Sequence, residues 1–177
     1  LLLPFLHKLN DTKTKIIFLL FFFHILVYSP PSILTHWIGC SWYSHDLHTF
    51  FLKLDCSCIF LASVFLTFTF SLAIFQKTTA LIYSTVSFLV FILLSQQMNT
   101  IFSNHHFRLY ATVIMVLFYL FPLFYSVFVD YDKTRAFCLV GIVLSLLLGA
   151  VVYQYRIPEC FFPKLFNYCG SHSFMHI

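Results

Sequence analysis

Long apolar stretches separated by short polar ones run through the 177-residue chain. A helix needs about 20 predominantly apolar residues to cross a bilayer. The pattern predicts six spanning helices and the start of a seventh, over residues 16–28, 32–45, 56–75, 80–97, 109–129, 136–153 and 166–177. We therefore expect an all-α, seven-transmembrane-helix bundle in a single domain, residues 1–177, whose seventh helix is truncated at Ile177.

The first two predicted helices are short, and Ser29-Pro30-Pro31 separates them. A proline pair either breaks a helix or begins the next one. A single kinked span over residues 16–40 is the alternative. Pro122 predicts a kink in the fifth span.

The composition places the chain in a membrane. Hydrophobic residues make up 60% and charged residues 9%, against about 25% charged residues in soluble domains. The net charge of +4 is spread along the chain, which excludes the basic footprint of a nucleic-acid-binding protein. The six cysteines form no CxxC pair, so Cys56 and Cys58 are interpreted as small apolar helix residues.

Lysine and arginine positions predict the orientation, because basic residues are enriched in cytosolic loops. A cytosolic N-terminus with alternating spans puts seven of these residues inside and three outside. The inside set is Lys8, Lys13, Lys15, Lys53, Arg108, Arg156 and Lys164, and the outside set is Lys77, Lys133 and Arg135. We expect a multi-pass integral membrane protein with a cytosolic N-terminus.

In this topology three distant stretches bring polar side chains to one membrane face. Ser41 and His45 end the second span, Asp55 begins the third, and His172 and His176 begin the seventh. Both the Ser41/His45 and the His172/His176 pairs are four residues apart, so each pair shares a helix face. Ionisable groups near a bilayer are costly and usually functional.

These residue types favour a zinc site. His45, His172 and His176 would supply three ligands and leave a fourth position for water, whose pKa zinc brings toward neutral. Asp55 would act as the general base or orient that water, and Ser41 would donate to a developing oxyanion. The predicted chemistry is hydrolysis of an amide or ester that enters from the lipid.

Each residue also has a simpler interpretation. Asp55 could be an N-cap of the third helix, Ser41 a small packing residue, and His48 a competitor of His45. Other polar residues are assigned without a site role: His24 and His36 as helix histidines with local partners, His105-His106 as a solvated loop, and Cys169 as a weak candidate ligand.

With these residues assembled, the chain resembles the progestin and adipoQ receptor family, which includes haemolysin III-like proteins. Three motifs carry the resemblance: Arg156-Ile-Pro-Glu-Cys-Phe-Phe-Pro163 followed by Ser-His-Ser-Phe-Met-His176, Ser41-x-x-x-His45, and Lys53-Leu-Asp55-Cys-Ser-Cys-Ile. The adiponectin-receptor-like branch is the most similar one.

The resemblance implies seven helices, a cytosolic N-terminus, and a Zn2+ ion held at the positions of His45, His172 and His176, with Asp55 contacting its water. It implies a ceramide-type lipid as substrate. The alternatives are a receptor for an extracellular ligand with structural zinc, and a haemolysin-like membrane-lytic protein. Two features differ from the family pattern: His45 and Asp55 are only ten residues apart, and Asn167 replaces an acidic residue.

Overall fold

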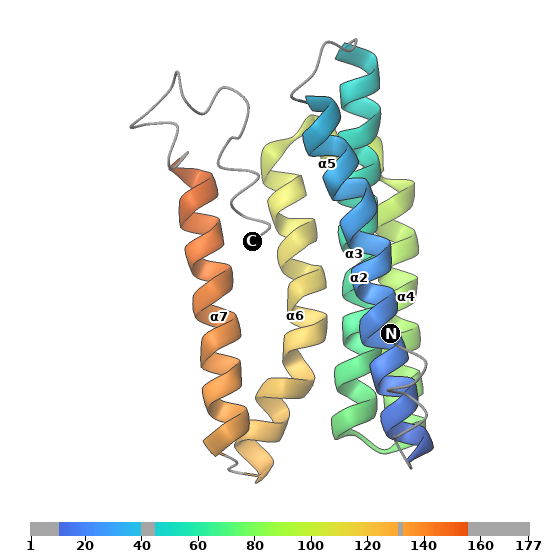
Figure 1. Cartoon of the computed structure of the whole chain (residues 1–177), viewed down its shortest axis with the longest axis vertical. Coiled ribbons are helices and arrows are strands. Elements are labelled where there is room, and N and C mark those ends of the chain that lie inside the picture. The colour runs from blue at the N-terminus through green and yellow to red at the C-terminus, as the bar shows by residue number, and fades with distance from the viewer. Residues whose placement is uncertain (1–10, 40–44, 131–132, 156–177) are drawn as a thin grey trace.

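The computed structural model describes residues 11–39, 45–130 and 133–155, which form six α-helices and, within these ranges, no strand. The helices are α2 (Thr12–Gly39), α3 (His45–Ile74), α4 (Lys77–Gln96), α5 (Met98–Ser103), α6 (His105–Asp130) and α7 (Lys133–Gln154). Five of them are long and run up and down side by side (Figure 1). The predicted all-α class is confirmed.

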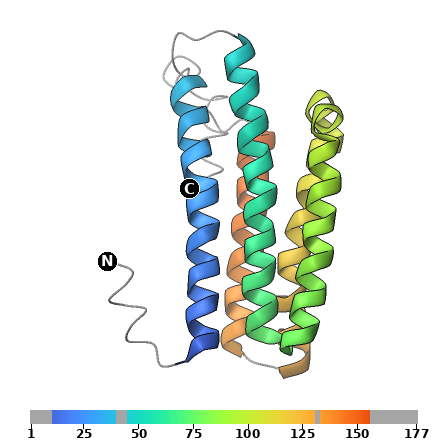
Figure 2. The ribbon, with the colours of Figure 1, turned by 90° about the vertical axis from the view of Figure 1, so that its right-hand side faces the viewer.

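The bundle has two ends, which we name by what they contain. The N-terminal end holds the start of α2, the α3–α4 connection and the α6–α7 connection. The α5 end holds the end of α2, the start of α3, the short helix α5 and the end of α7 (Figures 1 and 2).

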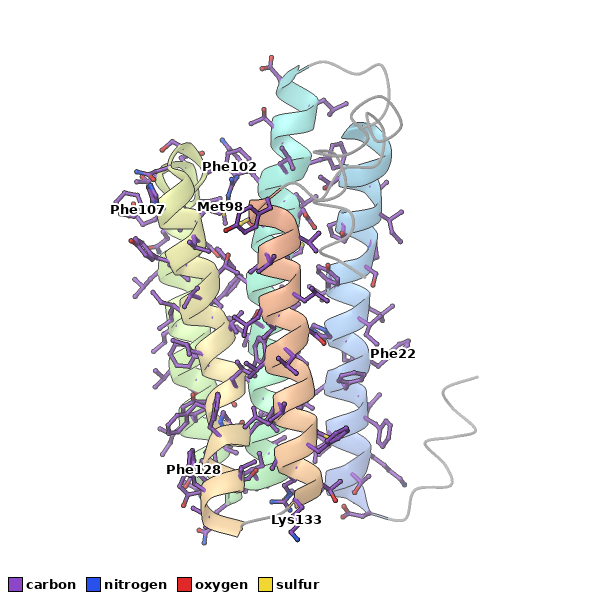
Figure 3. The ribbon with its side chains drawn as sticks, turned by 90° about the vertical axis from the view of Figure 1, so that its left-hand side faces the viewer. Phe22, Met98, Phe102, Phe107, Phe128 and Lys133 are labelled. Carbon is purple, nitrogen blue, oxygen red and sulfur yellow. The ribbon has the colours of Figure 1, made fainter. Side chains whose placement is uncertain are left out.

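The five long helices contain segments that are long and apolar enough to cross a membrane. These segments are Thr12–Thr35, Thr49–Ile74, Lys77–Gln96, His106–Val129 and Lys133–Val152. Large apolar side chains such as Phe128, Ile82 and Leu148 are exposed on the outside of the bundle (Phe128 is labelled in Figure 3). In water this surface would be an aggregation hazard, whereas in lipid it is the expected exterior. The protein is a multi-pass membrane protein.

Helix α2 is continuous through Pro30 and Pro31, so the prediction of two separate helices over 16–28 and 32–45 is wrong and the single-span alternative holds. Each predicted half would extend only about 20 Å, too short for a hydrocarbon core of about 30 Å. The prolines remove two helical donors, but prolines are tolerated in membrane helices where side-chain hydroxyls and neighbouring helices compensate.

Helix α3 begins at His45, well before the predicted start at residue 56. Residues 46–55, which separate the second and third predicted spans, are therefore helical. The predicted bounds of α4, α6 and α7 agree with the structure to within four residues. Pro122 lies inside α6, which changes direction along its yellow-to-orange second half (Figure 1). The predicted seventh span, 166–177, lies outside the described residues, so the count of seven stays a prediction.

Helix α3 lies at the centre of the bundle and packs against α2, α4 and α6. Hydroxyl groups join it to α4: Ser71 Oγ lies 3.0 Å from Ser84 Oγ, and Ser87 Oγ donates to Thr67 Oγ1 at 3.4 Å. Small hydroxyl residues allow close helix approach and bond across it in membranes. An apolar cluster nearer the α5 end contains Cys56, Phe60, Val64, Ile101, Ala111 and Met115.

Asp11 caps the start of α2 at the N-terminal end. Its carboxylate accepts hydrogen bonds from the Thr14 hydroxyl at 2.6 Å and from the backbone N–H groups of Thr14 and Lys13. The Thr14 hydrogen bonds lower the pKa of Asp11. A lowered pKa means that the cap is complete above the usual carboxyl pKa and is lost as the pH falls through the lowered value.

The continuous α2 changes the predicted orientation. Because only one helix separates them, residue 12 and residue 45 lie at opposite ends of the bundle (Figure 2). A cytosolic N-terminus and a cytosol-facing Asp55 region therefore exclude each other in this arrangement. Among the described residues, five basic side chains flank the N-terminal end and two flank the α5 end.

This arrangement makes a test of topology direct. Short epitope or glycosylation tags placed before Asp11 and in the α5–α6 connection at Asn104 are expected to report opposite sides of the membrane. A tag in the connection at Gln76 is expected to report the same side as the N-terminal tag. The measurement is protease protection or glycan attachment in sealed vesicles. Two separate helices in residues 16–45 would instead put the first two tags on the same side.

Candidate functional site

Asp55 is a carboxylate buried inside a membrane-spanning helix. It is the eleventh residue of α3 and is 2% exposed. This position excludes the simpler interpretation of Asp55 as an N-cap, because caps stand at the first turn. An intramembrane acid is costly and is retained mainly where it has a specific role. Asp55 is therefore the best-supported site residue in the described part of the chain.

Helix α2 meets α3 close to Asp55. The Thr35 hydroxyl donates to the backbone carbonyls of Pro31, at 2.8 Å, and Phe51, at 3.0 Å. Phe51 stands one helical turn before Asp55 in α3. Thr35 and Ser32 are 2% and 5% exposed. Two buried hydroxyl residues of α2 thus lie level with the buried carboxylate of α3.

The remaining predicted site residues are not tested by the structure. Ser41, His172 and His176 lie outside the described residues. His45 is the first residue of α3, but its side chain is outside the described part, as is that of His48. Within the described residues no three His, Cys, Asp or Glu side chains gather as a metal cluster. The three-histidine site stays a prediction.

The geometry of α3 disfavours His45 and Asp55 as members of one site. Ten residues along one helix separate their Cα atoms by about 15 Å of rise and about 80° of rotation. The neighbouring helix offers a nearer histidine. Because α2 and α3 are antiparallel and Thr35 contacts Phe51, His36 falls about 7 Å along the axis from the level of Asp55.

Ser32-x-x-x-His36 repeats the spacing of Ser41-x-x-x-His45. Residues four apart share a helix face, and Ser32 is buried. The sequence interpretation assigned His36 to a helix without a site role. One warning about His45 was present in the sequence, because its ten-residue spacing from Asp55 is shorter than the family pattern. The side chain of His36, like that of His45, lies outside the described part of the chain.

Two other predicted histidine assignments can be compared with the structure. His24 lies in α2 and has a local partner as expected, because its ring stacks on Tyr28 one turn further along the helix. It also has a distant partner, since its Nδ1 lies 3.2 Å from the carbonyl oxygen of Ala62 in α3. The predicted solvated loop at His105-His106 is instead the first turn of α6, where the Asn104 side chain accepts from the His106 N–H at 2.9 Å.

The two cysteines of α3 fit a packing role, whereas Cys138 in α7 is exposed. Cys56 is buried in the apolar cluster around α3, and Cys58, two residues further along the helix, is half-buried. Neither belongs to a metal cluster within the described residues. The prediction that Cys56 is a small apolar helix residue is confirmed.

The described residues fit one part of a zinc centre. Catalytic zinc sites combine histidine nitrogens with a nearby carboxylate in an apolar shell. Asp55 supplies a buried carboxylate next to the Cys56 and Phe60 cluster, and the buried residues Ser32 and Thr35 of α2 lie at the same level. The histidine part of the donor set rests on the sequence.

The Thr35 bridge leads to a prediction about stability. Thr35→Val keeps the side-chain shape and removes both hydroxyl contacts, so it is expected to lower the free energy of unfolding by about 0.6 kcal/mol, typical of interhelical hydrogen bonds in membranes. Thr85→Val is the matched control, because the Thr85 hydroxyl bonds only within α4, to Leu81, and is exposed. Thermal unfolding in detergent measures the difference. Equal effects of the two substitutions would contradict the bridge.

Comparison with known proteins identifies a family but no individual relative. The family model described as "Haemolysin-III related" matches residues 1–177, the entire chain. No curated protein and no solved structure matches.

Proposed function

Because this chain belongs to the haemolysin-III-related family, we propose that it is a membrane hydrolase with a zinc site near Asp55, cleaving a ceramide-type lipid amide. The observation that supports this proposal is the buried carboxylate of Asp55 in the interior of α3, beside the buried hydroxyl residues of α2. A packing role alone does not explain an acid at this position, since an apolar residue of similar size would cost less.

In the proposed mechanism, His172 and His176 would hold the zinc ion together with His45, and His36 of α2 is the alternative to His45. Bound zinc would supply a water of near-neutral pKa. Asp55 accepts the proton of the attacking water and passes it to the amine that leaves. The Ser41 hydroxyl donates to the oxygen of the amide carbonyl as negative charge develops there.

The surroundings of Asp55 suit an amphiphilic substrate. Between the α5 end and Asp55 the outer faces of the helices are apolar, with Phe50, Leu54 and Tyr110 exposed. A lipid approaching from the bilayer would keep its chains in hydrocarbon and bring a headgroup-level amide to the carboxylate. The buried hydroxyl groups between α3 and α4 are bonded to one another rather than lining a channel, which disfavours the membrane-lytic alternative.

Metal analysis tests the zinc assignment. We expect stoichiometric zinc in the purified wild-type protein and its loss in His172→Ala and His176→Ala. Between the two remaining histidines, the register of α2 and α3 predicts a larger loss for His36→Ala than for His45→Ala, because His36 is nearer the level of Asp55. Folding of each variant is checked by its unfolding temperature. Unchanged metal content in both His172 and His176 variants would refute the site.

Asp55→Asn separates an enzyme from a receptor with structural zinc. The amide keeps the volume and removes the base, so lipid amide hydrolysis is expected to fall by about 10²-fold or more while zinc is retained. The measurement is fatty-acid release from a ceramide in detergent or bilayers, with Asp46→Asn as the control acid at the exposed start of α3. A folded, zinc-loaded wild type without hydrolysis would favour the receptor.

A further inference from the structure

Pro122 removes the helical partner of one carbonyl group in α6. A proline has no N–H, so it cannot donate to the carbonyl four residues back, which here belongs to Phe118. Pro122 is fully buried, and Phe118 lies inside the spanning segment His106–Val129. The hydrocarbon of a bilayer contains no water that could bond to this oxygen. Another part of the protein has to supply a donor, or a buried acceptor stays unsatisfied.

The donor comes from the neighbouring helix α4. The hydroxyl of Tyr83 donates to the Phe118 carbonyl at 2.9 Å. This oxygen is the one that Pro122 deprives of its helical hydrogen bond, so the tyrosine replaces that bond from a different helix. We call the hydrogen bond from Tyr83 to Phe118 the latch.

Aromatic rings hold Tyr83 in position for the latch. Its ring lies 5.8 Å from the ring centres of Phe118 and Phe121, which precede the proline in α6. It also meets the Phe75 ring edge-on at 5.9 Å, and Phe75 in turn meets Tyr125 edge-on at 5.3 Å. Edge-to-face and offset ring pairs at these distances are favourable. Because Tyr125 follows the proline, the rings contact α6 on both sides of the kink.

The part of α6 after the kink carries α7. Leu123 and Val127 of α6 belong to one apolar cluster with Leu139, Ile142 and Val143 of α7. In the described part of the chain, α6 is the main neighbour of α7. Figure 1 shows α7 beside α6 at the edge of the bundle, away from α2 and α4. The position of α7 therefore follows the direction that α6 takes after the kink.

We propose that the latch sets the angle of the proline kink, and that opening it lets the end of α6 change direction together with α7. Without the tyrosine donor, the Phe118 carbonyl regains a partner only through local 3₁₀ or π adjustment, which changes the angle of a kinked helix. The part of α6 before the kink stays in place, because Ala111 and Met115 pack in the apolar cluster of α3. This device does not depend on zinc or on hydrolysis.

Distances between labelled helices test the latch. Nitroxides at the exposed positions Ile25 of α2 and Leu148 of α7 report on the moving part, and nitroxides at Ile25 and Ile114 report on α6 before the kink. They are attached to a ketone-bearing amino acid, which leaves the native cysteines untouched. Tyr83→Phe keeps the ring and removes the hydroxyl. It is expected to shift or broaden the 25–148 distance distribution, measured by pulsed electron paramagnetic resonance, and to leave the 25–114 distribution unchanged.

Tyr125→Phe is the matched control for this measurement. It removes the hydroxyl of an exposed tyrosine whose ring touches the same Phe75 ring, and it is expected to give the wild-type distribution with both label pairs. An unchanged 25–148 distribution in Tyr83→Phe would refute the latch. An equal change in Tyr125→Phe, or in the 25–114 pair, would also overturn it, because either result indicates a general loosening of the bundle.

A double-mutant cycle gives a second readout. Pro122→Ala restores the N–H at residue 122, so the Phe118 carbonyl regains its helical donor. Tyr83→Phe is expected to lower the unfolding temperature in the presence of the proline and to lower it less in the Pro122→Ala background. The reason is that losing a donor costs most where a buried acceptor is left unsatisfied. Equal losses in the two backgrounds would contradict the latch, and the label distances decide alone if Pro122→Ala does not fold.

Discussion

A bilayer offers no hydrogen bonds to an open backbone, and this constraint determines most of the structure. It keeps α2 helical through two adjacent prolines, since ending the helix at Pro30 would leave carbonyl and N–H groups in hydrocarbon. The same constraint makes hydroxyl groups useful between helices. The Thr35 hydroxyl joins α2 to α3, and the Ser71–Ser84 and Thr67–Ser87 contacts join α3 to α4. The central position of α3 follows from these contacts.

Much of this fold could be predicted from the apolar pattern. Helices α4, α6 and α7 are uninterrupted apolar stretches of spanning length, and the positions of the polar residues around them predict their bounds to within a few residues. The helix bounds that were predicted wrongly lie within residues 28–56, where α2 ends and α3 begins. There, Pro30-Pro31 and the polar stretch from Asp46 to Asp55 are ordinary helix-ending signals in soluble proteins. In this chain the requirement to cross the membrane and the packing against α3 outweigh those local preferences.

The candidate site was predictable in part. The importance of Asp55 could be derived from an acid within a long apolar region, and the structure adds that the residue is buried within α3 rather than at its start. The choice between His36 and His45 stays a prediction, and it depends on which residues of α2 lie level with Asp55. That register is fixed by the contact between Thr35 and Phe51. A one-dimensional spacing contains no information about the alignment of two neighbouring helices.

The proline pair in α2 has a mechanical consequence. Pro30 and Pro31 have no N–H, so the carbonyls of Leu26 and Val27 lose their usual donors four residues on. The helical turn from Leu26 to Pro31 therefore lacks two backbone hydrogen bonds, and the helix bends there with the least loss of bonding. Below it, His24 and Phe23 hold the helix to Ala62 and Phe65. Above it, Thr35 holds it to Phe51. Bending at this turn would therefore change the separation of His36 and Asp55 along the bundle and leave the contacts of Phe23 and His24 in place.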